Sequence, residues 1–524
     1  MNKLPLELYD RIVQFVGRRI GEESLPPWEH GTLPFALPAI AAVSRNFQEA
    51  VERLTFRNLR VSTSPEDLDV FRRALTPRRQ RNLRRLAVHL SIDHPMSRIT
   101  RPYLTRRFAT NQDRRVVNEA TTTQLRELFN ILAAWRLPGP SLTLEVTGPP
   151  LSYETKDNIY TTYLRFSMLD VSGDLVDFPP LPMVKQLYVY SMSCHLHPHL
   201  AVSLTAKMPN VSHVDWDLST CHTISLGLYH YLSRIWRDGL VQSIESTTLP
   251  SSVEKFSFKM FVPGTSRFQI LPNFIGLISS PDSVSLALRK LTKDCAEVYI
   301  DGSIHASLFD PPAVPGTAPH EAAPAWEKAT RLEVRASMCG PDGKWLFKID
   351  PNNGTPGNPP EDLDFDRLPP GYGTTESELD EAEEYCLEHL EDIAPETMDG
   401  GDPDDGEFFR TEADDGPMNA LLAAFARGCG RGNAPALRSA TLQSEFFNID
   451  NWPFQVTCYA AGAAAPLRWD AEFAGGDRDA WRVFFHVGDW RPAEETLEEF
   501  RRIGRERGGR DTVVCFLPWG NFLD

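Results

Sequence analysis

The chain has 524 residues, a net charge of −17 and eight scattered cysteines without a Cys-x-x-Cys pair. Its length exceeds the ~250 to 300 residues at which a single hydrophobic core stops growing, so we expect several folded units or a repeat array. The cysteine pattern argues against a disulfide scaffold, and no run approaches the ~20 apolar residues of a membrane span, so we expect a cytoplasmic or nuclear protein.

The first predicted elements are two amphipathic helices, over residues 5–16 and 37–56. In the first helix the apolar side chains recur at i, i+4, i+7 and i+8, on one face, and they are Leu8, Ile12, Phe15 and Val16. The second helix repeats such spacing at Ile40, Val43, Phe47, Val51 and Leu54. A unit below about 40 residues rarely folds alone, so the two stripes need either the rest of the chain or a partner protein.

The sequence Leu4-Pro5-Leu6-Glu7-Leu8, followed by Ile12 and by Val43-Ser44-Arg45-Asn46-Phe47, resembles an F-box of the kind abundant in filamentous fungi. In that family the helices bind a small Skp-type adaptor, which joins them to a cullin in an SCF-type ubiquitin ligase. The resemblance implies a substrate-receptor subunit that binds the adaptor and an unknown target protein, with no catalysis and no cofactor of its own. It assigns the adaptor contacts to these apolar positions: Leu4, Pro5, Leu8, Ile12, Phe15, Leu37, Val43 and Phe47.

Residues 71–120 hold 13 arginines, no lysine and three acidic residues, which is the strongest local positive charge in the chain. Arginine forks match the geometry of phosphates. The stretch lacks a groove-reading motif, a regular alternation of aromatics and a zinc-finger spacing, so we interpret it as a solvated face or a dock for the chain's own acidic segment. A phosphate- or nucleic-acid-binding module that uses this stretch is the alternative function.

Beyond the two helices one short pattern returns, with apolar residues at its first, fourth and sixth positions. The last two positions share one face of a strand, and the residues between them are mostly polar, as in a half-exposed strand. The copies are Phe56-Leu59-Val61, Leu83-Leu86-Val88, Val184-Leu187-Val189, Val211-Val214-Trp216, Val253-Phe256-Phe258, Cys295-Val298-Ile300 and Ala329-Leu332-Val334. A helix is predicted between two of them, over residues 123–135. The array resembles degenerate leucine-rich repeats, which implies an α/β region with a parallel or mixed sheet; an ordinary α/β domain is the alternative.

The tract Cys194-His195-Leu196-His197-Pro198-His199 is the best candidate for a metal site or a metal-dependent enzyme. Imidazoles two residues apart in an extended segment face the same side, and Cys221-His222 could join them as ligands. The spacing matches no recognised zinc pattern, and Pro198 fits a loop or turn. We therefore predict no metal and no catalytic residue.

Residues 361–416 hold 22 acidic residues against Arg367 and Arg410, a net charge of −20, which leaves the rest of the chain near neutral. Such a stretch buries too little apolar area to offset its ordering entropy, so we predict a mostly disordered insertion with one helix over 376–390. Order resumes at Met418, and residues 481–517 are predicted to form a strand, a helix and a strand that pairs in parallel with the first. The predicted organisation is a helical F-box unit at 1–58, a repeat-like α/β region at 59–350, the acidic insertion at 351–416, and the continued α/β region with its βαβ cap at 417–524.

Overall fold

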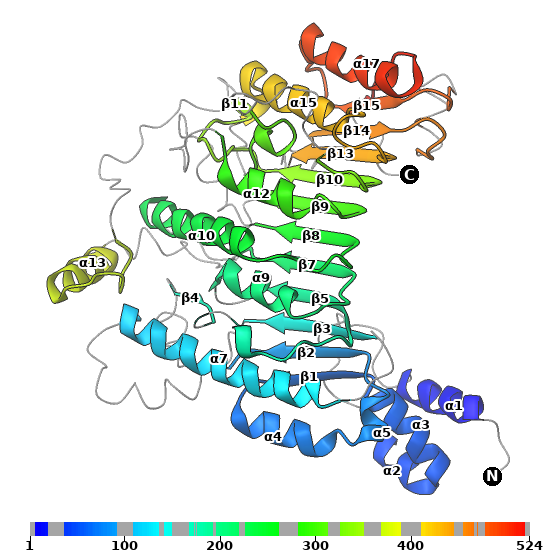
Figure 1. Ribbon diagram of the computed structural model, residues 1–524, viewed down its shortest axis with the longest axis vertical. Coiled ribbons are helices and arrows are strands. Elements are labelled where there is room, and N and C mark those ends of the chain that lie inside the picture. The colour runs from blue at the N-terminus through cyan, green and yellow to red at the C-terminus, as the bar shows by residue number, and fades with distance from the viewer. Residues whose placement is uncertain are drawn as a thin grey trace.

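The computed structural model describes residues 6–18, 36–91, 108–135, 141–148, 167–171, 173, 175–191, 195–219, 226–260, 281–312, 325–349, 368–388, 410–444, 454–465, 469 and 477–518. One large sheet stacks its strands along the long axis of the molecule, and a three-helix unit lies at the N-terminal end of the stack (Figure 1). Helices alternate with many of the strands along the chain. The described structure thus confirms the predicted α/β class with a mixed, mostly parallel sheet.

The main sheet has 12 strands, and their order in the sheet follows their order in the chain. Every pair is parallel except the two that β14 makes with its neighbours. Each strand therefore lies beside the strand that precedes it in the main sheet. The strands are β1 (Asn58–Ser62), β2 (Arg85–His89), β3 (Leu142–Thr147), β5 (Val184–Tyr190), β7 (His213–Asp217), β8 (Lys255–Lys259), β9 (Glu297–Gly302), β10 (Arg331–Ala336), β13 (Ser439–Ser444), β14 (Phe454–Tyr459), β15 (Arg482–His486) and β16 (Val513–Phe516).

The apolar triplets of the sequence become two ladders of side chains that run across all 12 strands on one face. The register brings together Leu59, Leu86, Leu144, Leu187, Val214, Phe256, Val298, Leu332, Ala440, Cys458, Val483 and Val514. The second ladder lies two residues further along each parallel strand. The triplet pattern missed β3 because the first position of its triplet is Ser141, although Leu144 and Val146 fill the other two.

Helices cover the apolar face, and their buried side chains form one continuous core with both ladders. Figure 1 shows them following one another along the stack in chain order. They are α4 (Pro65–Ala74), α7 (Asn111–Ala133), α9 (Pro198–Ala206), α10 (Leu226–Ser246), α12 (Ser283–Leu291), α15 (Asp415–Cys429) and α17 (Glu494–Gly508), while the short helix α5 (Pro77–Gln80) buries no side chain. The prediction of a helix start near residue 123 was wrong, because α7 begins at Asn111. There Thr110 and Asp113 form a capping box that the threonine-rich sequence after it had masked.

The N-terminal unit consists of α1 (Leu6–Arg18), α2 (Ala36–Val43) and α3 (Arg45–Thr55). The prediction of one continuous helix over 37–56 was wrong, since Ser44 adopts an extended conformation between α2 and α3. Its side chain accepts a hydrogen bond from the Phe47 N–H, so it caps α3. The unit has a small core of its own, separate from that of the sheet and formed by Tyr9, Val13, Leu37, Ala50 and Val51.

The acidic insertion begins and ends at a short antiparallel ribbon of β11 (Phe347–Ile349) and β12 (Arg410–Ala413). Its described part contains α13 (Glu376–Glu388), in agreement with the helix predicted over 376–390. The segment before α13 docks on the start of α7, where the Arg114 guanidinium lies 3.7 Å from the centre of the Tyr372 ring and donates to the Gly371 carbonyl at 2.7 Å. Gly371 has φ +83°, and a Cβ there would lie 2.0 Å from the Ala109 carbonyl oxygen. Residues 351–367 and 389–409, on which the prediction of disorder chiefly bears, lie outside the described residues.

At the C-terminal end, α17 lies between β15 and β16 in the chain, and these strands pair in parallel. This is the strand–helix–strand order expected from the sequence. Within the described residues, none of the helices combines the length and the apolar character needed to cross a bilayer.

Candidate functional site

The N-terminal unit buries one apolar stripe of α1 and exposes another. Tyr9 and Val13 are 1% and 0% exposed, and the Tyr9 ring packs edge-on against Phe47 at a centroid distance of 4.8 Å. Leu8 and Ile12, each one residue earlier, are 40% and 39% exposed. The helix therefore has a satisfied inner face and an uncovered apolar outer face.

Val43, at the end of α2, is 62% exposed. We call Leu8, Ile12 and Val43 the apolar seam. Across the described residues, only two other large apolar side chains are counted as exposed, Val70 and Val176. Leu8 and Ile12 are four residues apart on one helix and so lie on the same face, which makes this unit a candidate partner-binding surface.

The remaining predicted adaptor contacts have different positions. Leu37 is 1% exposed and belongs to the core of the unit, so it is not available as a surface contact for the adaptor. Phe47 is half-buried against Tyr9. Leu4 and Pro5 lie outside the described residues, as does the side chain of Phe15. The F-box resemblance had assigned all of these positions to the adaptor contact.

A buried carboxylate joins the N-terminal unit to the start of the sheet. Glu52 on α3 accepts hydrogen bonds from Nε and Nη2 of Arg79, at 3.3 and 3.0 Å, and lies 3.2 Å from Nη2 of Arg78. Arg79 also lies 4.6 Å from the centre of the Phe56 ring. Both arginines belong to α5, just before β2. This charge-assisted joint holds the seam in a defined position relative to the sheet.

The second candidate surface is the face of the sheet that the helices leave uncovered. Side chains alternate along each strand, so this face carries the residues between the apolar ladders. Most of those on β5 to β10 are half-exposed. The central row from β1 to β14 consists of Arg60, Ala87, Glu145, Tyr188, Asp215, Ser257, Tyr299, Glu333, Thr441 and Thr457.

Charged side chains on β8, β9 and β10 pair with their neighbours. Lys255 Nζ lies 2.7 Å from Glu297 Oε1 on the next strand, and Arg335 Nη1 lies 3.7 Å from Asp301 Oδ2. On β10 itself, Arg331 and Glu333 form a further ion pair at 2.8 Å. Cross-strand pairs of this kind stabilise a sheet modestly and leave little net charge on this part of the face.

Aromatic side chains gather on β5 and β7 instead. The Tyr188 and Tyr190 rings stack at a centroid distance of 5.9 Å, and the Tyr188 ring lies 5.5 Å from that of His213. Burial, reinforced by the negative charges of Asp215 and Glu145, raises the pKa of both tyrosines, so they remain neutral phenols at pH 7. Burial also raises the pKa of Asp215 and lowers that of His213.

At its C-terminal end the same face is closed. Ala465 and Trp469 pack over Phe484 and Cys515, so these residues of β15 and β16 lie in a small second core instead of facing solvent. The uncovered part of the face therefore lies before β15.

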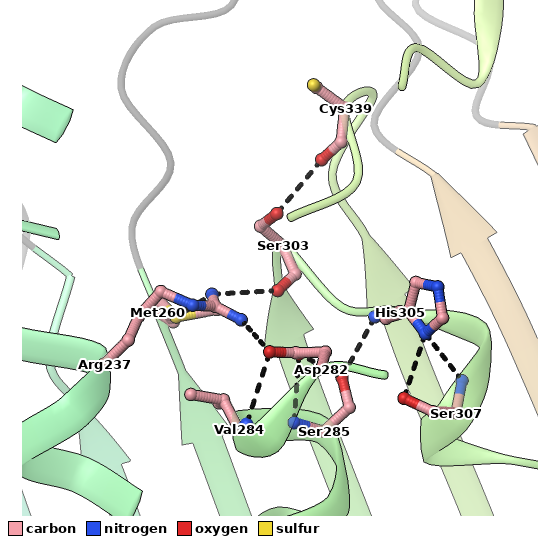
Figure 2. Close-up of polar contacts among 9 residues, drawn as sticks. All are labelled: Arg237, Met260, Asp282, Val284, Ser285, Ser303, His305, Ser307 and Cys339. Carbon is pink, nitrogen blue, oxygen red and sulfur yellow. Dashed lines mark hydrogen bonds and ion pairs between the residues drawn. The ribbon is translucent and has the colours of Figure 1, made fainter. Parts of the chain in front are cut away.

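A buried polar network ties the ends of β8, β9 and β10 together (Figure 2). Asp282 caps α12 and pairs with Arg237 of α10 at 2.6 Å, and the two side chains are 0% and 5% exposed. The Arg237 guanidinium also donates to the Ser303 carbonyl at 3.5 Å, and the Ser303 hydroxyl donates to the Cys339 carbonyl at 3.1 Å. Figure 2 shows His305 beside Ser307, with Nδ1 2.9 Å from Oγ, while Asp282 turns away toward Arg237. The contacts among Arg237, Ser303 and Cys339 hold the ends of these strands together.

The histidine tract has a structural role in the part that the structure describes. His197 caps α9, Pro198 occupies its first turn, and both His197 and His199 place Nδ1 near Asp170, at 3.3 and 3.1 Å. A Cβ at Gly239 would lie 2.5 Å from His197 Nε2, so glycine gives the ring its space. Within the described residues, no group of three or more His, Cys, Asp and Glu side chains is placed to hold a metal ion. Cys194, Cys221 and His222 lie outside them.

Most described arginines of the 71–120 stretch have internal partners. Arg72 pairs with Glu127, Arg85 with Glu145 at 2.6 Å, and Arg114 with backbone carbonyls. Arg78 and Arg79 form the joint with Glu52. Among the described residues, the chain's own acidic segment docks here through Tyr372 and the Gly371 carbonyl. Arg98, Arg101, Arg106 and Arg107 lie outside the described residues, and the alternative of a phosphate-binding module stays a prediction.

Searches against protein-family models and against curated proteins find no match to this chain. Its function is therefore inferred from the apolar seam and the uncovered face of the sheet.

Proposed function

We propose that the protein is a substrate-receptor subunit of an SCF-type ubiquitin ligase. The N-terminal unit binds a Skp-type adaptor through the apolar seam, and the uncovered face of the sheet holds a target protein. A separate enzyme of the complex performs the chemistry. The receptor contributes effective concentration, because it keeps the target near the transferring enzyme.

The observation that carries this proposal is the split between the two faces of α1. Tyr9 and Val13 already fill the core of the unit, so Leu8 and Ile12 are not needed for its folding. Exposed apolar side chains that share one helix face support a surface that a partner covers. Three of the positions that the F-box resemblance assigns to the adaptor are those that the fold leaves uncovered.

The topology of the sheet supports the second half of the proposal. Parallel strands that follow one another without crossing, with helices on one face, are the arrangement expected of a degenerate leucine-rich-repeat region. Such arrays grow along one axis and present an extended surface for binding. The Glu52 joint fixes this surface relative to the seam, as a receptor that positions its target requires.

The test is a binding assay between the intact protein and a purified Skp-type adaptor, with the variant Leu8→Asp, Ile12→Asp. Loss of two buried apolar anchors is expected to weaken adaptor binding at least about 100-fold, since each such anchor contributes roughly 2 kcal/mol. Circular dichroism and the melting temperature are expected to stay unchanged, because neither side chain belongs to the core.

The matched control is Val70→Asp, Val176→Asp, which places the same charges at two other exposed apolar positions. It is expected to bind the adaptor like the wild type. Failure of the wild-type protein to bind the adaptor, or binding by the Leu8→Asp, Ile12→Asp variant at wild-type strength, would contradict the proposal.

A further inference from the structure

The uncovered face of the sheet has one region where its charges do not cancel. Around the tyrosines of β5, the register places Glu145 of β3 and Asp215 of β7 on either side of Tyr188, and Asp217 beside Tyr190. Three carboxylates therefore flank two stacked phenol rings. We call Tyr188, Tyr190, His213 and Asp215 the aromatic–acidic patch.

Two of the three carboxylates have basic partners. Arg85 Nε lies 2.6 Å from Glu145 Oε1, and Lys259 Nζ lies 3.5 Å from Asp217 Oδ2. Asp215 forms no ion pair with any residue that the structure describes. Its side chain is hydrogen-bonded to Ser257, while its Oδ1 atom is shielded from solvent and accepts no hydrogen bond. Lys259 and His213 act on Asp215 electrostatically without forming an ion pair with it, so within the described residues the patch has one carboxylate that lacks an ion-pair partner.

The rest of the face differs in this respect. On β8 to β10 the lysines and arginines face carboxylates of the same or the next strand. An incoming charged side chain would have to break one of those pairs, which offsets what it gains. At the aromatic–acidic patch an incoming cation would instead complete a missing pair.

The chemistry of the patch selects a cation. The π faces of tyrosine rings attract ammonium and guanidinium groups, and more strongly when the site is partly desolvated. A planar guanidinium can also stack on the rings while it faces a carboxylate. Phosphates and carboxylates would be repelled by the flanking acids, which argues against nucleic acid as the occupant.

We propose that the aromatic–acidic patch binds an arginine or lysine side chain presented by an extended basic segment of a protein target. The half-exposed polar side chains of β8 to β10 continue from the patch across the sheet. They provide a surface along which the rest of such a segment can lie. The identity of this occupant as a ubiquitination target rests on the proposed function. The cation preference itself rests on the patch alone.

The experiment uses the intact protein and three fluorescein-labelled decapeptides of Gly and Ser, with Arg-Arg, Ala-Ala or Glu-Glu at the centre. Fluorescence anisotropy is expected to show at least about 10-fold tighter binding of the Arg-Arg peptide than of the Ala-Ala peptide, with the Glu-Glu peptide weakest. The preference should shrink as salt is raised from 50 to 500 mM, because the attraction is electrostatic. Equal binding of the three peptides would overturn the proposal.

Three variants locate the site. Asp215→Asn is expected to weaken binding of the Arg-Arg peptide about 5- to 10-fold, and Tyr188→Ala by a similar factor, while Tyr188→Phe keeps the ring and stays within about 2-fold. Glu333→Gln removes a charge elsewhere on the same face and serves as the matched control, also within about 2-fold. A wild-type affinity in Asp215→Asn, or an equal loss in Glu333→Gln, would overturn the assignment to this patch.

Two further readouts separate the possible explanations. A merely structural Asp215 would lower the melting temperature when replaced, whereas removal of an unpaired, half-buried carboxylate is expected to leave it unchanged or higher. Free arginine amide is expected to bind at least about 10-fold more weakly than the peptide, and equal binding would overturn the assignment to a peptide segment. Adaptor binding, measured on the same preparation, tests the proposed function separately from the patch.

Discussion

The N-terminal unit and the sheet leave opposite kinds of surface uncovered. The unit buries its tyrosine and valine and exposes leucine, isoleucine and a second valine. The sheet buries its apolar ladders, except at its two edge strands, where Leu59, Val514 and Phe516 are partly buried, and it exposes polar side chains, most of whose charges are already paired. An exposed apolar surface favours a long-lived partner, whereas a polar surface with few unsatisfied groups suits exchangeable ones. The proposed receptor would need both kinds of surface, one for a lasting complex and one for targets that it releases.

The largest expected effect concerns the stability of the sheet. Asp282→Ala leaves Arg237 buried without its carboxylate, which is expected to lower the free energy of unfolding by about 3 to 5 kcal/mol. Urea denaturation measures it. The control is Asp294→Ala, whose partner Lys328 lies 3.4 Å away on the exposed surface, with an expected change below about 1 kcal/mol. Similar losses in both variants would mean that the network of Figure 2 adds no rigidity.

The next effect compares the buried and the exposed face of α1. Val13→Ala removes two buried methyl groups and is expected to destabilise the N-terminal unit by about 2 kcal/mol. Leu8→Ala is expected to change its stability by less than about 0.5 kcal/mol but to weaken adaptor binding. Native-state hydrogen exchange of α1 reports the first quantity and a binding assay the second. The split between the two faces of α1 would be refuted if Leu8→Ala opened the helix as much as Val13→Ala.

A smaller effect concerns the connection between the two regions. Glu52→Gln removes the charge that holds Arg78 and Arg79, and is expected to lower stability by about 1 to 2 kcal/mol. Hydrogen exchange should rise at α3 and α5 together, while β8 and β9 remain protected. Glu49→Gln is the control, since Glu49 contacts Arg78 only at 3.6 Å and at the exposed surface. Unchanged exchange in Glu52→Gln would show that the joint is not held by this charge.

The smallest effect is a dependence on pH. Burial lowers the pKa of His197, against the opposing influence of Asp170, so the ring stays neutral in the folded state. The unfolded pKa is about 6.5, so the stabilisation is complete above that pH and is lost as the pH falls through the lower, folded pKa. Unfolding free energies at pH 7 and pH 5 measure this slope. His197→Asn keeps a hydrogen-bond acceptor for the helix cap but removes the titrating ring, so the pH dependence of the unfolding free energy is expected to become flatter. An unchanged slope would assign the titration to other groups.

Much of the sheet could be predicted from the sequence, because buried strands need apolar side chains at fixed spacing. All seven triplets from Phe56 to Val334 coincide with strands β1, β2, β5, β7, β8, β9 and β10. The strand β3 was not predicted, because Ser141 occupies the first position of its triplet, where the pattern requires an apolar residue. Two helix boundaries were also missed, at Ser44 and Asn111. At both, a capping side chain determines where the helix begins, and the spacing of apolar residues does not mark it.

The candidate sites show where such prediction ends. The sequence by itself determined that α1 is amphipathic and that polar residues alternate with the ladders. It did not determine whether Tyr9 and Val13 or Leu8 and Ile12 face inward, because both pairs have helical spacing and the choice depends on what α3 presents to them. Likewise, Tyr188 and Asp215 meet only through the register of β5 with β7. Only the tertiary structure decided these contacts, since the free energy of burial is set by neighbours that lie far away in the chain.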